Sequence, residues 1–195
     1  MPRVKQFSEA EVLEKGMELF WKQGFHATSI QNLVDHLGIN RASLYDTFGG
    51  KKAFFQKAFA LYRNSNKQRI EEFLANYPSV KEGLRYLLLS SIEQVVNNQE
   101  DYGCLTINCT VELLPHDKDM LSVLQENKAE FEAVFYHYLL SGVQNGEISK
   151  NKDLKAIASY FYTFYGGLKV MTKVEKSRQK LEDVIQVGLS VLEDS

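Results

Sequence analysis

A short segment opened by Asn40 carries side chains that could contact a nucleic acid. If this segment is a helix, Leu44 points back to a core, and the outward faces are left to Arg41, Ala42, Ser43, Tyr45, Asp46 and Thr47. Guanidinium and hydroxyl groups in such places can donate hydrogen bonds to phosphates and to base edges in the major groove. The segment is therefore a candidate recognition helix.

Two further helices have to hold that segment at a steep angle. The first is expected from Ser8 to Gly24 and the second from near Thr28, each with Glu or Gln three residues after its opening hydroxyl, as in a capping box. A tight turn at Gly38-Ile39 then leads into the segment, because glycine tolerates a left-handed backbone. Three short helices within residues 8–48, the last two joined by such a turn, are the layout of a helix-turn-helix.

The rest of the chain also has helical spacing and no hairpin pattern. A long fourth helix is expected from Lys51 to about residue 75, before Pro78. The fifth helix is expected to begin at Ser79 and to end in the polar run 97–101. The later helices are expected at about 104–114, 118–144, 153–173 and 177–192. We therefore predict an all-α fold of nine helices without a strand.

Charge is unevenly divided along the chain. Residues 1–70 hold 11 basic and 6 acidic side chains, and the net charge of the whole chain is -2, so the first 70 residues carry +5 and the remainder -7. This division is typical of a polyanion-binding head on a body that does not bind polyanions. The absence of an apolar stretch of roughly 20 residues, of a secretory signal at the first residues and of a disulfide framework favours a cytoplasmic protein without membrane contact.

The helix-turn-helix resembles the DNA-binding domain of the TetR family of transcriptional regulators. The resemblance covers about residues 8–59, and the residues that match in order and spacing are Leu19-Phe20, Gly24-Phe25, Thr28-Ser29-Ile30, Gly38-Ile39, Leu44-Tyr45, Phe48 and Lys51. It implies a sequence-specific DNA-binding regulator, in its usual form a repressor released by a small-molecule ligand. On that basis we expect a DNA-binding domain at 1–50, a connecting helix at about 51–75, and a ligand-binding and dimerisation domain at 51–195.

The resemblance also assigns roles to individual residues. The positions expected to contact DNA are Thr28, Ser29, Arg41, Ala42, Ser43, Tyr45 and Lys51. Thr28 is similar to the residue that hydrogen-bonds a phosphate at the start of the second helix. Arg41 and Ser43 resemble residues that face the groove, whereas Tyr45 and Lys51 resemble contacts to backbone phosphates.

Three positions depart from the family pattern. Asp46 and Thr47 stand where many members have His and Tyr, and Asn40 stands where Ser is common. Asn40 keeps the chemistry of a helix cap. A carboxylate near phosphates is repulsive unless it accepts from a cytosine amine or pairs with a neighbour such as Lys51, so the roles of Asp46 and Thr47 are open.

A single helix-turn-helix contacts few bases, so such proteins bind palindromic double-stranded DNA as two-fold dimers. The last two helices resemble the dimerising pair of the family, in which two helices from each subunit form a four-helix bundle. Their apolar residues are Ile157, Phe161, Phe164, Leu168 and Met171, then Leu181, Val184, Ile185, Leu189 and Leu192. The alternative is that these stripes pack into the core of their own subunit.

By the same resemblance, the central helices enclose an apolar pocket whose ligand changes the separation of the two DNA-binding heads. The expected ligand is a small apolar or aromatic molecule. The expected lining residues are Leu105, Asn108, Cys109, Glu112, Phe131, Phe135, Tyr138, Tyr162 and Tyr165. An ordinary aromatic core would use the same residue types.

Other reactive residue types indicate little further chemistry. Cys104 and Cys109 would lie about 8–9 Å apart on a helix, beyond the roughly 7 Å limit for a disulfide, although Cys104 could act as a single reactive thiol. The polar turn at His116 lacks a known metal-ligand spacing, and we find no catalytic constellation. We therefore expect no metal, cofactor or enzymatic activity. The alternative function is a helical small-molecule binding protein whose DNA-binding head is non-functional, supported by the carboxylate in the recognition segment.

Overall fold

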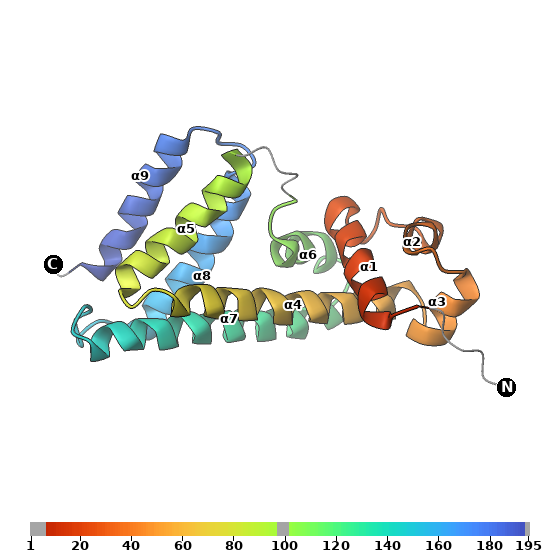
Figure 1. Cartoon of the computed structure of the whole chain (residues 1–195), viewed down its shortest axis with the longest axis horizontal. Helices are drawn as coiled ribbons and strands as arrows, with labels where there is room; N and C mark the ends of the chain where they lie inside the picture. The colour runs from red at the N-terminus through yellow and green to blue at the C-terminus, as the bar shows by residue number, and fades with distance from the viewer. Residues whose placement is uncertain (1–6, 97–101, 194–195) are drawn as a thin grey trace. The chain divides into compact units, whose positions relative to one another are not determined.

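The computed structural model describes residues 7–96 and 102–193. Within these ranges the chain forms nine α-helices, one short 3₁₀ helix and no strand (Figure 1), which confirms the predicted all-α fold. The helices are α1 (Glu9–Gln23), α2 (Ile30–Leu37), α3 (Arg41–Phe48), α4 (Lys51–Ala75), α5 (Val80–Val96), α6 (Leu105–Leu113), α7 (Asp119–Gln144), α8 (Leu154–Met171), α9 (Arg178–Leu189) and η1 (Ser190–Leu192). The polar run 97–101, predicted to end the fifth helix, lies outside the described residues.

The chain divides into two compact units. The first is Met1–Asn66 with Leu105–Met120, and the second is Lys67–Cys104 with Leu121–Ser195. The division therefore falls within α4, and α6 belongs with the first three helices. A compact unit is not by itself a functional domain, so the functional boundary expected after residue 50 stays a prediction.

Local sequence explains how the helix-turn-helix of the first unit is shaped. The side chain of Asn40 accepts a hydrogen bond from the backbone N–H of Ser43 at 2.8 Å, so it caps α3. Gly38 ends α2 with φ 65°, in the left-handed region, where a residue with a Cβ is strained. The predicted turn glycine and the predicted cap are both confirmed.

The second helix begins later than its predicted start near Thr28. Its N-cap is Ser29, whose Oγ accepts from the backbone N–H of Asn32 at 3.0 Å, and the Asn32 side chain accepts from the Ser29 N–H at 3.0 Å. Thr28 is buried, and its hydroxyl donates to the carbonyl of Gly24 at 2.6 Å. The two adjacent hydroxyl residues thus have different roles: Thr28 holds the preceding turn through its bond to Gly24, and Ser29 caps the helix.

Aromatic side chains fill the core of the first unit. Phe20 of α1 meets Phe55 of α4 edge-on with 5.1 Å between ring centroids, and Phe48 of α3 meets Phe54 in the same manner at 4.8 Å. Gly16 lets α1 approach α4, since a Cβ added there would lie 2.2 Å from the Phe54 ring. These contacts fix α3 on its support.

In the second unit α5, α8 and α9 lie side by side (Figure 1) and share a core with α7. Its buried residues include Leu84, Leu88, Ile92, Phe135, Leu139, Phe161, Leu181 and Ile185. None of the helices within the described ranges is long and apolar enough to cross a membrane.

Candidate nucleic-acid interface

Helix α3 turns one face inward and presents the other to solvent. Leu44 and Phe48 are 0 % and 3 % exposed, which confirms that this side of the helix packs on the core. The exposed side chains of α3 are Arg41, Ala42, Tyr45 and Asp46, and Ser43 and Thr47 are half-buried. The recognition face predicted from the sequence is therefore free to meet a partner.

Arg41 and Tyr45 lie one turn apart on this face and contact each other. The guanidinium carbon of Arg41 is 5.8 Å from the centroid of the Tyr45 ring. The ring also lies close to the turn after α3, where a Cβ on Gly50 would lie 3.2 Å from Tyr45 Cε1. Both side chains are thus oriented before any ligand arrives, which lowers the entropy cost of binding.

The two residues predicted to contact DNA at the start of α2 differ in exposure. Ser29 is exposed at the helix N-terminus, whereas Thr28 is 0 % exposed and its hydroxyl is already bonded to Gly24. The structure does not present the Thr28 hydroxyl to a phosphate. A phosphate at this helix end would instead meet Ser29 and the exposed backbone beside it.

Lys51, the predicted phosphate contact of α4, lies against the turn between α1 and α2. Its Nζ is 4.3 Å from the centroid of the Phe25 ring, at cation–π distance. Burial lowers the pKa of Lys51, and the nearby carboxylate of Glu112 acts in the opposite direction. The ammonium group is therefore placed at the edge of the helix-turn-helix, and its contact with a phosphate stays a prediction.

Glu112 of α6 holds the turn between α1 and α2. Its two carboxylate oxygens accept hydrogen bonds from the backbone N–H groups of Phe25 at 3.1 Å and His26 at 2.6 Å. Gly24, at φ 85°, makes room for the carboxylate, because an added Cβ would lie 2.9 Å from Glu112 Oε2. The family resemblance predicted that Glu112 lines the ligand pocket. In the structure both of its carboxylate oxygens accept hydrogen bonds from this turn. No short-range sequence pattern predicts that contact.

A second carboxylate contact in the same unit was also missed. Lys52 of α4 pairs with Asp117 at 2.8 Å and with Asp119 at 3.2 Å, at the turn between α6 and α7. The hydrogen bond from Lys52 holds the pKa of Asp117 below its ordinary value. The side chains of Lys52 and Asp119 are 50 % and 79 % exposed, so solvent screens this ion pair and it orients the turn more than it stabilises the fold.

The residues predicted to line a ligand pocket fall into both units. Leu105 and Cys109 are buried in the first unit, where Asn108 is half-buried. In the second unit Phe131, Phe135 and Tyr165 are buried core residues, and Tyr162 is half-buried. Burial raises the pKa of Tyr162, although a hydrogen bond with Asn127 opposes that effect. The pocket stays a prediction.

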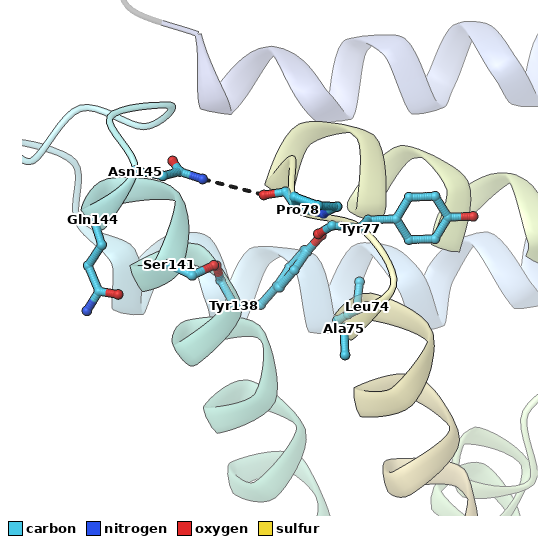
Figure 2. Close-up of a pocket in the computed structure, with 8 residues that line it drawn as sticks. All are labelled: Leu74, Ala75, Tyr77, Pro78, Tyr138, Ser141, Gln144 and Asn145. Carbon is cyan, nitrogen blue, oxygen red and sulfur yellow. Dashed lines mark hydrogen bonds between the residues drawn. The ribbon is translucent and has the colours of Figure 1, made fainter.

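Tyr138 has a role of its own beside a surface hollow of about 490 Å³ in the second unit (Figure 2). Its hydroxyl donates to the carbonyls of Tyr77 at 2.9 Å and Ser79 at 3.1 Å, and burial raises the pKa of Tyr138 to about 12. The Asn145 side chain donates to the Pro78 carbonyl at 3.4 Å across the same hollow. Tyr138 therefore fixes the connection between α4 and α5.

The apolar stripes of the last two helices serve two purposes. Phe161, Leu168, Leu181, Ile185 and Leu192 are buried in the subunit core, as the alternative of packing within the subunit predicted for them. Three other side chains leave a large apolar surface on the same helices, with exposures of 50 % at Met171, 49 % at Val184 and 72 % at Val187. A hollow of about 560 Å³ lies on this face, lined by Tyr160, Phe164, Gly167, Met171, Leu181 and Val184 among others.

The remaining candidate chemistry is sparse. Cys104 is half-buried and Cys109 is buried. In the part of the chain that the structure describes, no group of three or more His, Cys, Asp or Glu side chains could hold a metal ion.

Family comparisons agree with the architecture. Residues 12–58 match the model of the bacterial regulatory proteins of the tetR family, and residues 81–187 match a tetracyclin repressor-like C-terminal domain. An uncharacterised HTH-type transcriptional regulator, YezE of Bacillus subtilis, is 34% identical over 194 residues, which is 99% of this chain and 100% of the relative. The HTH-type transcriptional repressor ComR of Escherichia coli is 25% identical, over 93% and 87% of the two chains.

A solved structure gives the same fold. The TetR family regulator CifR, a cysteine mutant in complex with a 26-bp operator DNA, superposes with a TM-score of 0.83 at 25% identity, over 96% of this chain and 98% of that one. The reduced form of NemR from Escherichia coli, at 20% identity, shares the fold with a TM-score of 0.80 over 95% and 97%.

Proposed function

Because the chain belongs to the TetR family of bacterial regulatory proteins, we propose that it is a sequence-specific DNA-binding repressor that a small apolar or aromatic molecule releases from its operator. The observation that carries the proposal is the exposed face of α3, with Arg41 and Tyr45 oriented on a helix that Asn40 caps. The repressor ComR and the operator complex of CifR support it by similarity. We place the protein in the cytoplasm, as a regulator and not an enzyme.

Two copies are needed to read a palindromic operator. The exposed apolar surface of α8 and α9, centred on Met171, Val184 and Val187, supports a homodimer through the last two helices. Large exposed apolar patches of this kind mark interaction sites. The alternative of a small-molecule binding protein with a non-functional DNA-binding head is not favoured, because the recognition face of α3 is exposed to solvent.

Selection of bound DNA from a random library tests the proposal. The purified protein should enrich a palindromic site, and its affinity should fall steeply with salt as phosphate contacts release counterions. Arg41→Ala should weaken binding to the selected site on the order of 10-fold or more, while Arg85→Ala, an exposed arginine of α5, should change it little. Absence of any sequence-selective, salt-dependent binding would reject the proposal.

A further inference from the structure

Asp46 lies at the centre of the exposed face of α3. It is two residues from buried Leu44 and two residues from buried Phe48, so at 100° per residue its side chain points about 200° from each of them. Ala42, one turn before it, is also exposed and too short to cover the carboxylate. Asp46 is therefore the side chain that projects most directly away from the supporting core.

The nearby cations are engaged elsewhere. Lys51 lies over the Phe25 ring at 4.3 Å, Lys57 over the Phe48 ring at 5.4 Å, and Arg41 over the Tyr45 ring at 5.8 Å. Among residues 7–96 and 102–193, the carboxylate of Asp46 takes part in no ion pair or hydrogen bond. The structure therefore does not show Lys51 neutralising the Asp46 carboxylate, which was one explanation for an acidic residue at this position.

An unpaired carboxylate in the major groove has a narrow choice of partners. Phosphates and the N7, O6 and O4 atoms of the bases are acceptors and repel it, so only the exocyclic amines of cytosine and adenine can donate to it. The adenine amine stands beside the N7 acceptor, which repels the second carboxylate oxygen. The cytosine N4 amine stands beside a C–H group, so cytosine is the better partner.

We propose that Asp46 is a specificity residue that reads a C·G pair in each operator half-site by accepting a hydrogen bond from the N4 amine of cytosine. The inference rests on the proposed function, in which α3 enters the major groove. Arg41 lies five residues earlier, about 7.5 Å along the helix axis, so the two charged residues of α3 address different base pairs. A half-site read by this helix should contain one cytosine that depends on Asp46 alone.

Parallel library selections with wild type, Asp46→Ala and Asp46→Asn test this reading. Wild type should select a fixed cytosine at one position of each half-site, and Asp46→Ala should make only that position degenerate. Asp46→Asn should move the preference there toward adenine, because the amide can bond both N6 and N7. Glu14→Gln, which removes an exposed carboxylate from α1 of the same unit, is the charge control and should keep the wild-type site.

A chemical probe isolates the proposed hydrogen bond. N4-methylcytosine keeps its base pair with the methyl group in the groove, where it replaces the hydrogen offered to Asp46. At the selected position it should weaken wild-type binding on the order of 10-fold and leave Asp46→Ala binding unchanged.

The outcomes separate this inference from the function on which it rests. If wild type selects no sequence at all, the proposed repressor function fails. If wild type selects a palindrome but Asp46→Ala selects the same palindrome, or binds every sequence more tightly by the same factor, the carboxylate acts only by repulsion or not at all, and the assignment to cytosine is overturned.

Discussion

The carboxylate of Glu112 accepts a hydrogen bond from the backbone N–H of His26 at 2.6 Å, across 86 residues of sequence. The neighbouring N–H of Phe25 donates to the same carboxylate at 3.1 Å. Ser29, the cap of α2, follows three residues after His26. One side chain of α6 therefore sets the geometry of the turn that leads into the helix-turn-helix.

Replacing Glu112 by Ala should lower the free energy of unfolding by about 1–3 kcal/mol, because two backbone donors lose a charged acceptor. Glu112→Gln should cost less, since one oxygen can still accept. Urea denaturation measures both. Val111→Ala, at the preceding and 73 % exposed position of α6, is the matched control. An equal effect of Glu112→Ala and Val111→Ala would contradict the role of the turn contact.

Gly83 and Tyr138 form a close pair that a double-mutant cycle can measure. A Cβ on Gly83 would lie 1.9 Å from Tyr138 Oη, so Gly83→Ala should destabilise the fold by roughly 1–3 kcal/mol through overpacking. Tyr138→Phe removes the hydroxyl and its two hydrogen bonds at a cost of about 1 kcal/mol. In the Tyr138→Phe background Gly83→Ala should cost measurably less, and additive losses would show that the hydroxyl is not the obstacle.

The sequence predicted helix limits well wherever the deciding contact is local. The Asn40 side chain needs only the backbone three residues on, and Ser177 caps α9 in the same way. At the start of α2 the same rule was ambiguous, because Thr28 and Ser29 can each cap. Burial of Thr28 against the turn decides between them, and burial is not local information.

Contacts between residues far apart in the chain could not be predicted from the sequence. Glu112 and Tyr138 have the residue types of a polar-edged pocket, and only the fold shows them bonded to backbone groups 86 and 61 residues away. The spacing of apolar residues in the last two helices likewise predicted which residues lie on an apolar face. It could not say that Ile185 faces the subunit core while Val184 faces outward.

Glu147 should make stability depend on pH in the acidic range. Burial by itself raises the pKa of Glu147, but hydrogen bonds from the Lys81 N–H, the Ser79 hydroxyl and the Val80 N–H outweigh it, so the pKa lies below its ordinary 4.5. A group with a lowered folded-state pKa stabilises the fold above pH 4.5, and the contribution is lost as the pH falls through the folded-state value.

Glu147→Gln should therefore lower the free energy of unfolding by about 1 kcal/mol at pH 7, with a gap to wild type that closes as the pH falls below 4.5. Urea denaturation at a series of pH values measures it. Glu82→Gln, at an exposed position of α5, should change stability little throughout. If the difference in free energy of unfolding between wild type and Glu147→Gln did not change with pH, the negative charge of Glu147 would not be what stabilises the start of α5.

A charge on the exposed apolar face of α9 should dissociate the proposed dimer without unfolding the subunit. Val187 is 72 % exposed, so Val187→Glu leaves the core untouched, but in a dimer it would bury a carboxylate without a partner. Light scattering after size exclusion should give about twice the 22.4 kDa chain mass for wild type and the single mass for Val187→Glu. Val111→Glu, at an equally exposed valine of α6, should stay dimeric, while circular dichroism shows all three folded. A dimeric Val187→Glu variant would move the interface away from this face of α9, and the two-fold reading of the operator would then need another surface to bring the heads together.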